Sequence, residues 1–86
     1  MSTMLFLMAQ YGGKAVVPLE VVCRDYFPHL KVEKFLRKVA AGETRLPVVR
    51  IEASQKAAKG VHIIDLAQYI DARREAALKE LQQLSW

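Results

Sequence analysis

Two short amphipathic segments in the first half of the chain are separated by only three residues. The first ends before Pro28 and has apolar residues at helical spacing, namely Leu19, Val22, Cys23, Tyr26 and Phe27. The second, Lys31–Gly42, repeats this spacing with Val32, Phe35, Leu36 and Val39. The periodicity predicts two helices, each with one buried face, and Gly42 is suited to cap the second. Helices joined by so short a turn must cross steeply, which indicates a helix-turn-helix.

Segments rich in β-branched residues flank a polar stretch after the helix pair. Leu46–Ile51 and Val61–Ile63 are predicted to be strands, and Lys14–Val17 is predicted to be a short extended piece that leads to Pro18 in the first turn of a helix. The stretch between the two strands, Glu52–Gly60, is small, polar and basic. It is typical of a hairpin tip, although its alanines would also permit a short helix.

The two ends of the chain complete the predicted fold. Thr3–Tyr11 is apolar on all sides, so the pattern permits either a short helix capped by Thr3 or a strand. A long C-terminal helix, 64–84, is expected to begin near Asp65 and to reach roughly 30 Å. These elements predict one α+β domain over residues 1–86. The predicted fold is a winged helix-turn-helix with a small antiparallel sheet and a long C-terminal helix.

The far half of the last helix has more apolar residues than a short domain can cover. They are Ala77, Leu78, Leu81, Leu84 and Trp86. Pairing of these helices between copies would bury them, so we expect a homo-oligomer, either a dimer or a higher assembly. The alternative is a helix that folds back over its own core.

Positive charge is concentrated in one third of the chain. Lys31–Gly60 contains eight basic and three acidic residues, whereas the rest contains five basic and six acidic ones. The segment therefore carries +5 and the remainder −1, for a total of +4. A local basic surface on a nearly neutral scaffold favours a polyanionic partner, although basic faces are often only solvated.

The second helix of the pair is expected to present its cations away from the core. In helical projection the apolar residues lie on one arc, and the basic residues lie on the other: Lys31, Lys34, Arg37 and Lys38. An α-helix fits the major groove of B-DNA, where lysine and arginine neutralise phosphates and arginine pairs with guanine. These four residues are therefore predicted to contact double-stranded DNA.

The hairpin is expected to contact DNA as a wing. Its candidate contacts are Ser54, Gln55, Lys56 and Lys59, which suit a loop that follows a phosphate backbone or enters a minor groove. Arg50 lies in the strand before it, between Val49 and Ile51, and should face opposite to them. It would then reach DNA or simply be exposed.

The chain has no recognisable catalytic, metal or cofactor site. No nucleophile–base set or phosphate-binding loop is visible, and His29 and His62 have no neighbouring ligands. The single cysteine, Cys23, lies in an apolar helical context and is expected to be buried. No segment suits a membrane span, so we expect a soluble intracellular protein. We also expect it to bind no small molecule.

Several segments together resemble the pyocin activator (PrtN) family. They are Leu7–Gly13, Pro18–Phe27, Leu46–Lys56 and Lys59–His62. The resemblance spans roughly residues 4–74. It implies a cytoplasmic, nucleoid-associated bacterial transcription activator, which binds a promoter element upstream of phage-tail-like bacteriocin genes or prophage genes. The order of elements is also similar to excisionase and AlpA-type winged helices.

Two other classes of function stay open from the sequence. An excisionase-like architectural protein would bend DNA without activating a promoter. A protein-interaction module, such as an antirepressor or an RNA polymerase adaptor, would act without DNA contact. Contact with RNA polymerase is also compatible with an activator.

Overall fold

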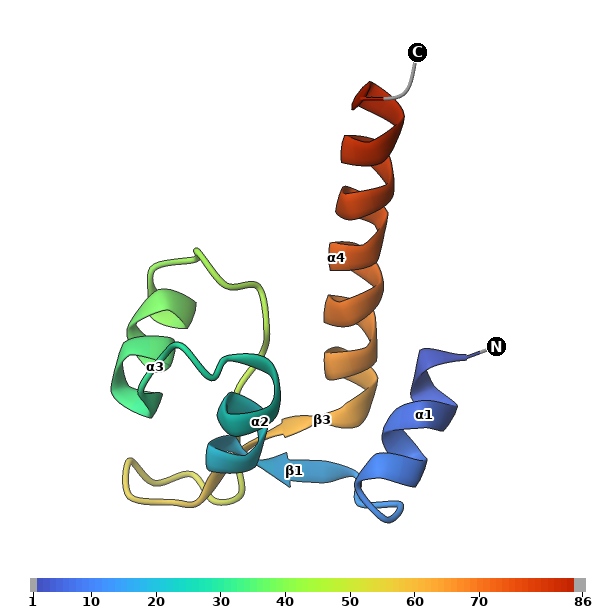
Figure 1. Cartoon of the computed structure of the whole chain (residues 1–86). Coiled ribbons are helices and arrows are strands. Elements are labelled where there is room, and N and C mark those ends of the chain that lie inside the picture. Colours follow the sequence, from blue (N-terminus) through green and yellow to red (C-terminus); the bar gives the residue numbers. More distant parts are fainter. Residues whose placement is uncertain (1, 85–86) are drawn as a thin grey trace.

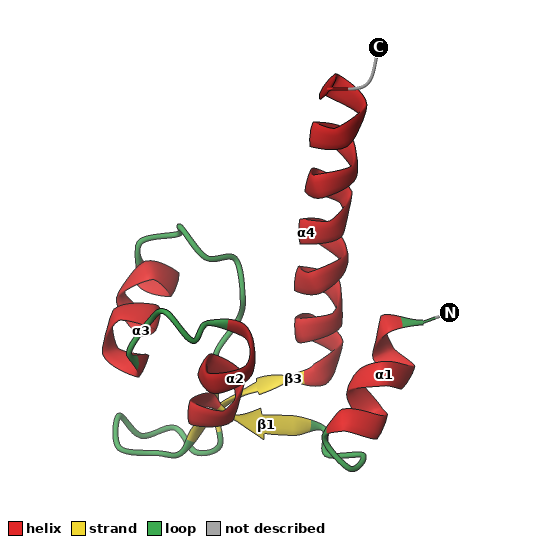
Figure 2. Cartoon of the chain, viewed as in Figure 1, coloured by secondary structure: helices red, strands yellow, loops and turns green. Residues whose placement is uncertain are grey.

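The computed structural model describes residues 2–84, which form an α+β domain (Figure 1, Figure 2). In chain order its elements are α1 (Thr3–Gln10), β1 (Val16–Pro18), α2 (Leu19–Tyr26), α3 (Val32–Ala40), β2 (Val49–Arg50), β3 (Lys59–His62) and α4 (Ile63–Leu84). The strands form one antiparallel sheet in the order β1-β3-β2. The predicted fold class, with its small antiparallel sheet and long C-terminal helix, is confirmed.

The apolar N-terminal segment is a helix and not a strand. Ser2 caps it, because its hydroxyl oxygen accepts a hydrogen bond from the N–H of Met4 at 3.1 Å. The expected cap, Thr3, instead donates its hydroxyl hydrogen to Asp71 of α4. After the helix, Gly12 and Gly13 take φ values of 63° and 78°, which are left-handed conformations that favour glycine.

The helix pair forms as the periodicity predicts. A turn of five residues joins α2 to α3, and Gly42 follows α3 with a φ of 76°, as expected of a C-terminal glycine. The N-terminal boundary of α2 differs from the prediction. Pro18 is the last residue of β1 and the N-cap of α2, so it precedes the first turn.

The β2–β3 hairpin forms, and the short alanine helix does not. The strand predicted over Leu46–Ile51 is shorter, since only Val49 and Arg50 pair with β3 as strand residues. The strand predicted over Val61–Ile63 begins earlier, at Lys59, and Ile63 already belongs to α4. The N–H of Ile51 still donates to the carbonyl oxygen of Ala58 at 3.0 Å, which closes the loop.

The core lies where α2, α3, the sheet and the base of α4 meet. Phe35 of α3 is fully buried, with its ring 4.8 Å from that of Phe27, which in turn lies 5.7 Å from Tyr69 of α4. Val22 of α2 and Val61 of β3 are also fully buried. This shared core fixes α3 against the rest of the domain.

α4 begins directly after β3 and extends beyond the domain (Figure 1). Asp65, near which the helix was expected to begin, lies inside the first turn and places its negative charge there. The acceptor nearest the helix start is the Nδ1 of His62, which receives a hydrogen bond from the N–H of Ile64 at 3.1 Å. The helix continues to Leu84, the last residue that the structure describes.

Candidate nucleic-acid interface

The exposed face of α3 carries the predicted cations. Phe35 and the partly buried Val32, Leu36 and Val39 pack on the core, and this orients the opposite side of the helix outward. Lys34 and Arg37 are exposed on that side, and Lys31 is exposed at the N-cap position. Lys38 is half-buried, so it lies at the border between the two faces.

The cations of α3 are not neutralised within the domain. Across residues 2–84, an ion pair with an N···O distance of 4.0 Å or less joins only Arg24 and Asp25. Glu33 is exposed on the same helix and places one negative charge at its flank. The Lys34 and Arg37 side chains are therefore available to an external anion.

The hairpin loop between β2 and β3 is held by its own polar groups. The Ser54 hydroxyl oxygen accepts a hydrogen bond from the N–H of Lys56 at 3.2 Å. The Lys59 ammonium donates to the carbonyl oxygen of Gln55 at 3.2 Å. Ser54 and Lys59 thus contribute to the shape of the loop, while the side chains of Gln55 and Lys56 are exposed at its tip.

Two cations face each other across the base of the hairpin. Arg50 of β2 is the register partner of Lys59 of β3, so both side chains rise from the same face of the sheet. Arg50 is exposed, as expected, whereas Val49 is half-buried and Ile51 is largely exposed. Like charges directly opposite each other destabilise a strand pair, and a bound phosphate would relieve that repulsion.

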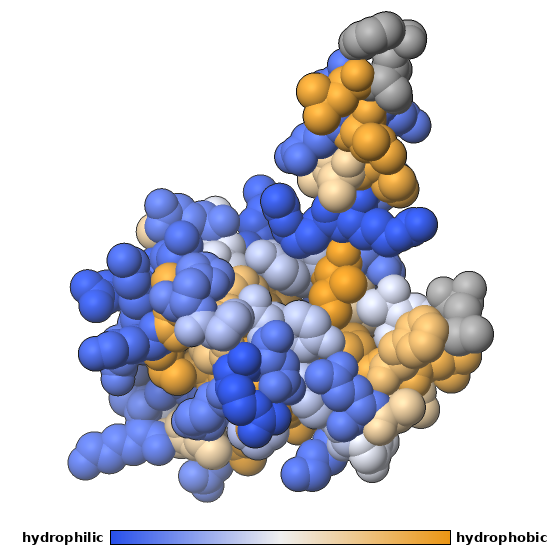
Figure 3. Space-filling view, viewed as in Figure 1, coloured by the Kyte–Doolittle hydropathy of each residue, from blue (hydrophilic) through white to orange (hydrophobic). Residues whose placement is uncertain are grey.

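α3 and the hairpin lie on the same side of the molecule, away from α1 (Figure 1). In the same view this side is largely hydrophilic, whereas the region of α1 is apolar (Figure 3). The fold therefore brings together the two basic segments that are separate in the sequence.

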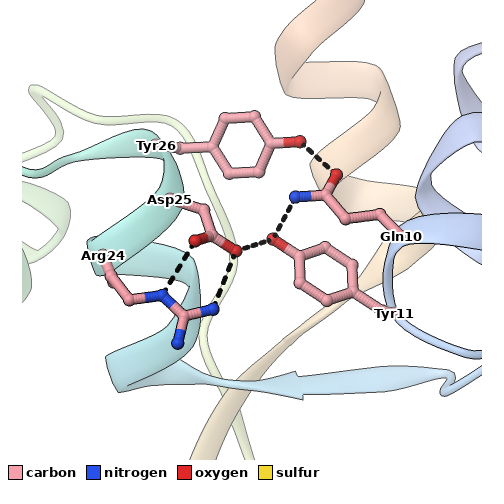
Figure 4. A network of polar contacts seen from close by, with 5 residues as sticks. All are labelled: Gln10, Tyr11, Arg24, Asp25 and Tyr26. Atoms are coloured by element: carbon pink, nitrogen blue, oxygen red, sulfur yellow. Dashed lines mark hydrogen bonds and ion pairs between the residues drawn. The ribbon is translucent and has the colours of Figure 1, made fainter.

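A polar network joins the end of α1 to α2 (Figure 4). The Tyr11 hydroxyl donates to Asp25 at 2.7 Å, and the Arg24 Nε donates to the same carboxylate at 2.9 Å. Gln10 donates to the Tyr11 oxygen at 3.3 Å and accepts from the Tyr26 hydroxyl at 2.9 Å. The sequence pattern placed Tyr26 on the buried face of its helix and did not reveal this network.

The network is electrostatically consistent with a structural role. Hydrogen bonds from Arg24 and Tyr11 lower the pKa of Asp25, so its carboxylate stays ionised. Burial and the hydrogen bond to Asp25 raise the pKa of Tyr11, which therefore stays protonated. Neither group is poised for proton transfer near neutral pH.

The described part of the chain contains neither a candidate metal site nor a candidate transmembrane helix. No group of three or more His, Cys, Asp or Glu side chains within residues 2–84 could hold a metal ion. Cys23 is buried, and burial followed by the charge of Glu20 raises the pKa of its thiol. None of the described helices combines the length and apolar character needed to cross a membrane.

The apolar residues proposed for oligomerisation project from the domain on the far half of α4. Ala77, Leu78, Leu81 and Leu84 are all exposed there. Trp86, the fifth residue of the prediction, lies outside the described residues. The structure thus shows the helix extending away, and it does not fold back over its own core (Figure 1).

Comparison with known proteins gives one match. The model of the family described as pyocin activator protein PrtN matches residues 3–77, which include every element from α1 to the middle of α4. No curated protein and no solved structure matches the chain significantly.

Proposed function

Because the chain belongs to the pyocin activator protein PrtN family, a family of transcription activators and not of enzymes, we propose that it activates pyocin genes by binding double-stranded DNA in a sequence-specific manner. In this proposal α3 occupies the major groove and the β2–β3 hairpin is the wing. The contacts are Lys31, Lys34, Arg37 and Lys38 from α3, and Arg50, Ser54, Gln55, Lys56 and Lys59 from the hairpin.

The main support for this proposal is that α3 and the β2–β3 hairpin, which are both basic, lie on the same side of the molecule. Lys34 and Arg37 are exposed, and their charges are not paired with a carboxylate in residues 2–84. Arg50 and Lys59 are cross-strand neighbours on the hairpin. An array of cations on a protruding helix and an adjacent hairpin fits the repeating phosphates of a duplex.

The contacts are expected to differ in what they contribute. Lys34 lies near the start of α3 and suits a phosphate contact, which fixes register but reads no base. Arg37 offers a planar guanidinium, which can pair with guanine in the major groove through two hydrogen bonds. Ser54 and Lys59 act within the loop, so they support the wing chiefly by maintaining its shape.

The proposal is tested by titration of promoter fragments at several salt concentrations. With about six phosphate contacts, log K should fall against log salt with a slope near −5, by the rule of ~0.9 per phosphate. Lys34→Glu should weaken binding to all duplexes. Lys14→Glu is the matched control, because it makes the same charge change at an exposed position in the turn after α1. Absent or salt-insensitive binding would contradict the proposal.

Replacement of Arg37 by alanine separates base recognition from backbone contact. Loss of a guanine contact should relax base preference by about 1–3 kcal/mol at one position of the operator. A uniform loss over all sequences would reassign Arg37 to the phosphate backbone. Bending of the bound fragment, measured by circular permutation, would identify the architectural alternative if it occurs without promoter activation.

We also propose that the exposed stripe on α4 mediates self-association. Ala77, Leu78, Leu81 and Leu84 follow helical spacing on a part of α4 that projects from the domain. Burial of these side chains against another copy would stabilise a dimer and double the number of DNA contacts.

A further inference from the structure

The outer face of α1 is apolar and uncharged. Met4, Leu7 and Tyr11 turn toward the core, whereas Leu5 and Phe6 are 59% and 60% exposed and Met8 is 42% exposed. No residue of α1 is charged, and the first charged residue of the chain is Lys14. A helix that is apolar on all sides is normally buried on all sides. In the described structure only one side of α1 is covered.

The stripe on α4 continues the side of that helix that packs on the core. Ile63, Leu66 and Ile70 contact the core, and the same line runs on through Ala77, Leu81 and Leu84. Arg73 and Arg74 follow Ile70 in the sequence and interrupt this line. Figure 3 shows a hydrophilic band across α4, with apolar surface above it. We call the segment from Ala77 to Leu84 the α4 arm.

The α4 arm by itself is too small to hold a dimer. Leu78, Leu81 and Leu84 are 37%, 61% and 75% exposed. At about 200 Å² for a large side chain, they offer roughly 350 Å², whereas a stable interface buries about 800 Å² per partner. The outer face of α1 offers roughly another 320 Å² on the same basis. Both surfaces together therefore approach the area that a specific dimer requires.

We propose that the α4 arm of one copy packs on the outer face of α1 in a second copy, and that the second copy reciprocates. This inference rests on the proposed self-association and names the surface that receives the arm. The arm is about 12 Å long, as is the eight-residue α1, by the rise of 1.5 Å per residue. Because α1 has no charge, the arm meets no opposing charge there. A two-fold axis creates two equivalent contacts, so the arm and the outer face of α1 are buried in both copies.

A pair of matched substitutions tests the role of α1. Phe6→Gln should weaken dimerisation at least tenfold in sedimentation equilibrium. Ile51→Gln is the control, because Ile51 is also 60% exposed but lies on the hairpin, and it should leave dimerisation unchanged. Circular dichroism verifies the fold of both variants, and Leu5→Gln replaces Phe6→Gln if the latter does not fold. A monomeric wild-type protein, or a Phe6→Gln protein that dimerises like wild type, would overturn the inference.

Cross-linking between two different variants tests the arrangement. Met8→Cys and Leu84→Cys proteins, mixed and oxidised, should form a disulfide between the two kinds of chain, since the arm of one lies on α1 of the other. Cross-links only between two Leu84→Cys chains would instead show arm-to-arm pairing and contradict the inference. Lys34→Glu, which should weaken DNA binding, should leave both the sedimentation and the cross-linking results unchanged. A failure of DNA binding can therefore be distinguished from a failure of this dimer.

Discussion

Asp25 connects the turn after α1 to helix α2 through two different donors. Its carboxylate accepts from Tyr11, fourteen positions earlier, and from its neighbour Arg24. Arg24 is largely exposed, so the ion pair itself contributes little to stability. The hydrogen bond from Tyr11 lies in a partly buried contact and fixes the orientation of α1 on the domain.

Replacement of Asp25 by asparagine should reveal a pH-dependent contribution to stability. The pKa of Asp25 is lowered in the folded protein, so its contribution is present above the unfolded pKa of about 4 and is lost as pH falls through the folded value. Wild type should therefore exceed Asp25→Asn in unfolding free energy at pH 7, and the difference should shrink below pH 4. Urea unfolding at both pH values measures this. A difference that does not depend on pH would contradict the assignment.

The sheet depends on a close approach between β1 and β3. Gly60 of β3 pairs with Pro18, and a Cβ atom at Gly60 would lie 2.6 Å from both the Val17 carbonyl oxygen and the Val16 Cγ1. The carbonyl belongs to the backbone and cannot rotate aside. Any side chain at this position must therefore separate the two strands.

Gly60→Ala should destabilise the domain by about 1–3 kcal/mol, the usual cost of overpacking. Thermal and urea unfolding measure the loss. Gly12→Asn is a suitable control, because Gly12 has open space around it and asparagine tolerates its left-handed conformation. If Gly60→Ala proved no less stable than the control, the close packing of β1 on β3 would be wrong.

How far the elements could be predicted depends on whether their cause is local. The cation arc of α3 and the cap at Gly42 follow from residues three or four positions apart. The structure confirms the glycine at the helix end and the exposure of Lys31, Lys34 and Arg37. The strand limits and the start of α4 were wrong by a few residues, because hydrogen bonds from other segments decide where pairing stops. Lys38 is half-buried, which the helical projection did not predict.

The whole molecule separates two surfaces, one basic and one apolar. The basic side carries α3 and the hairpin, whereas α1 and the α4 arm carry six of the eight large apolar side chains that are exposed within residues 2–84 (Figure 1, Figure 3). The radius of gyration of 14.4 Å and the longest dimension of 51 Å reflect the projecting helix. A dimer through the apolar surfaces would therefore leave both basic surfaces accessible to DNA.

Binding to duplexes with one and with two operator half-sites should show whether the two surfaces act together. Wild type should prefer the two-site duplex by ~10²-fold or more, because the second contact is intramolecular. Phe6→Gln should lose most of this preference but retain its affinity for the single site. Gel-shift titration at constant salt measures both. An unchanged preference in Phe6→Gln would mean that α1 has no part in paired binding.

The sequence by itself determined the helix pair, the hairpin and the helical stripe of α4, because each follows from the alternation of apolar and polar residues over short distances. The sequence also revealed the positive charge of Lys31–Gly60 and the family resemblance. Only the tertiary structure decided that Thr3 meets Asp71, that Tyr11 meets Asp25, and that the outer face of α1 is exposed. These features depend on contacts between residues far apart in the chain, and no local pattern specifies which of several apolar faces the core will cover.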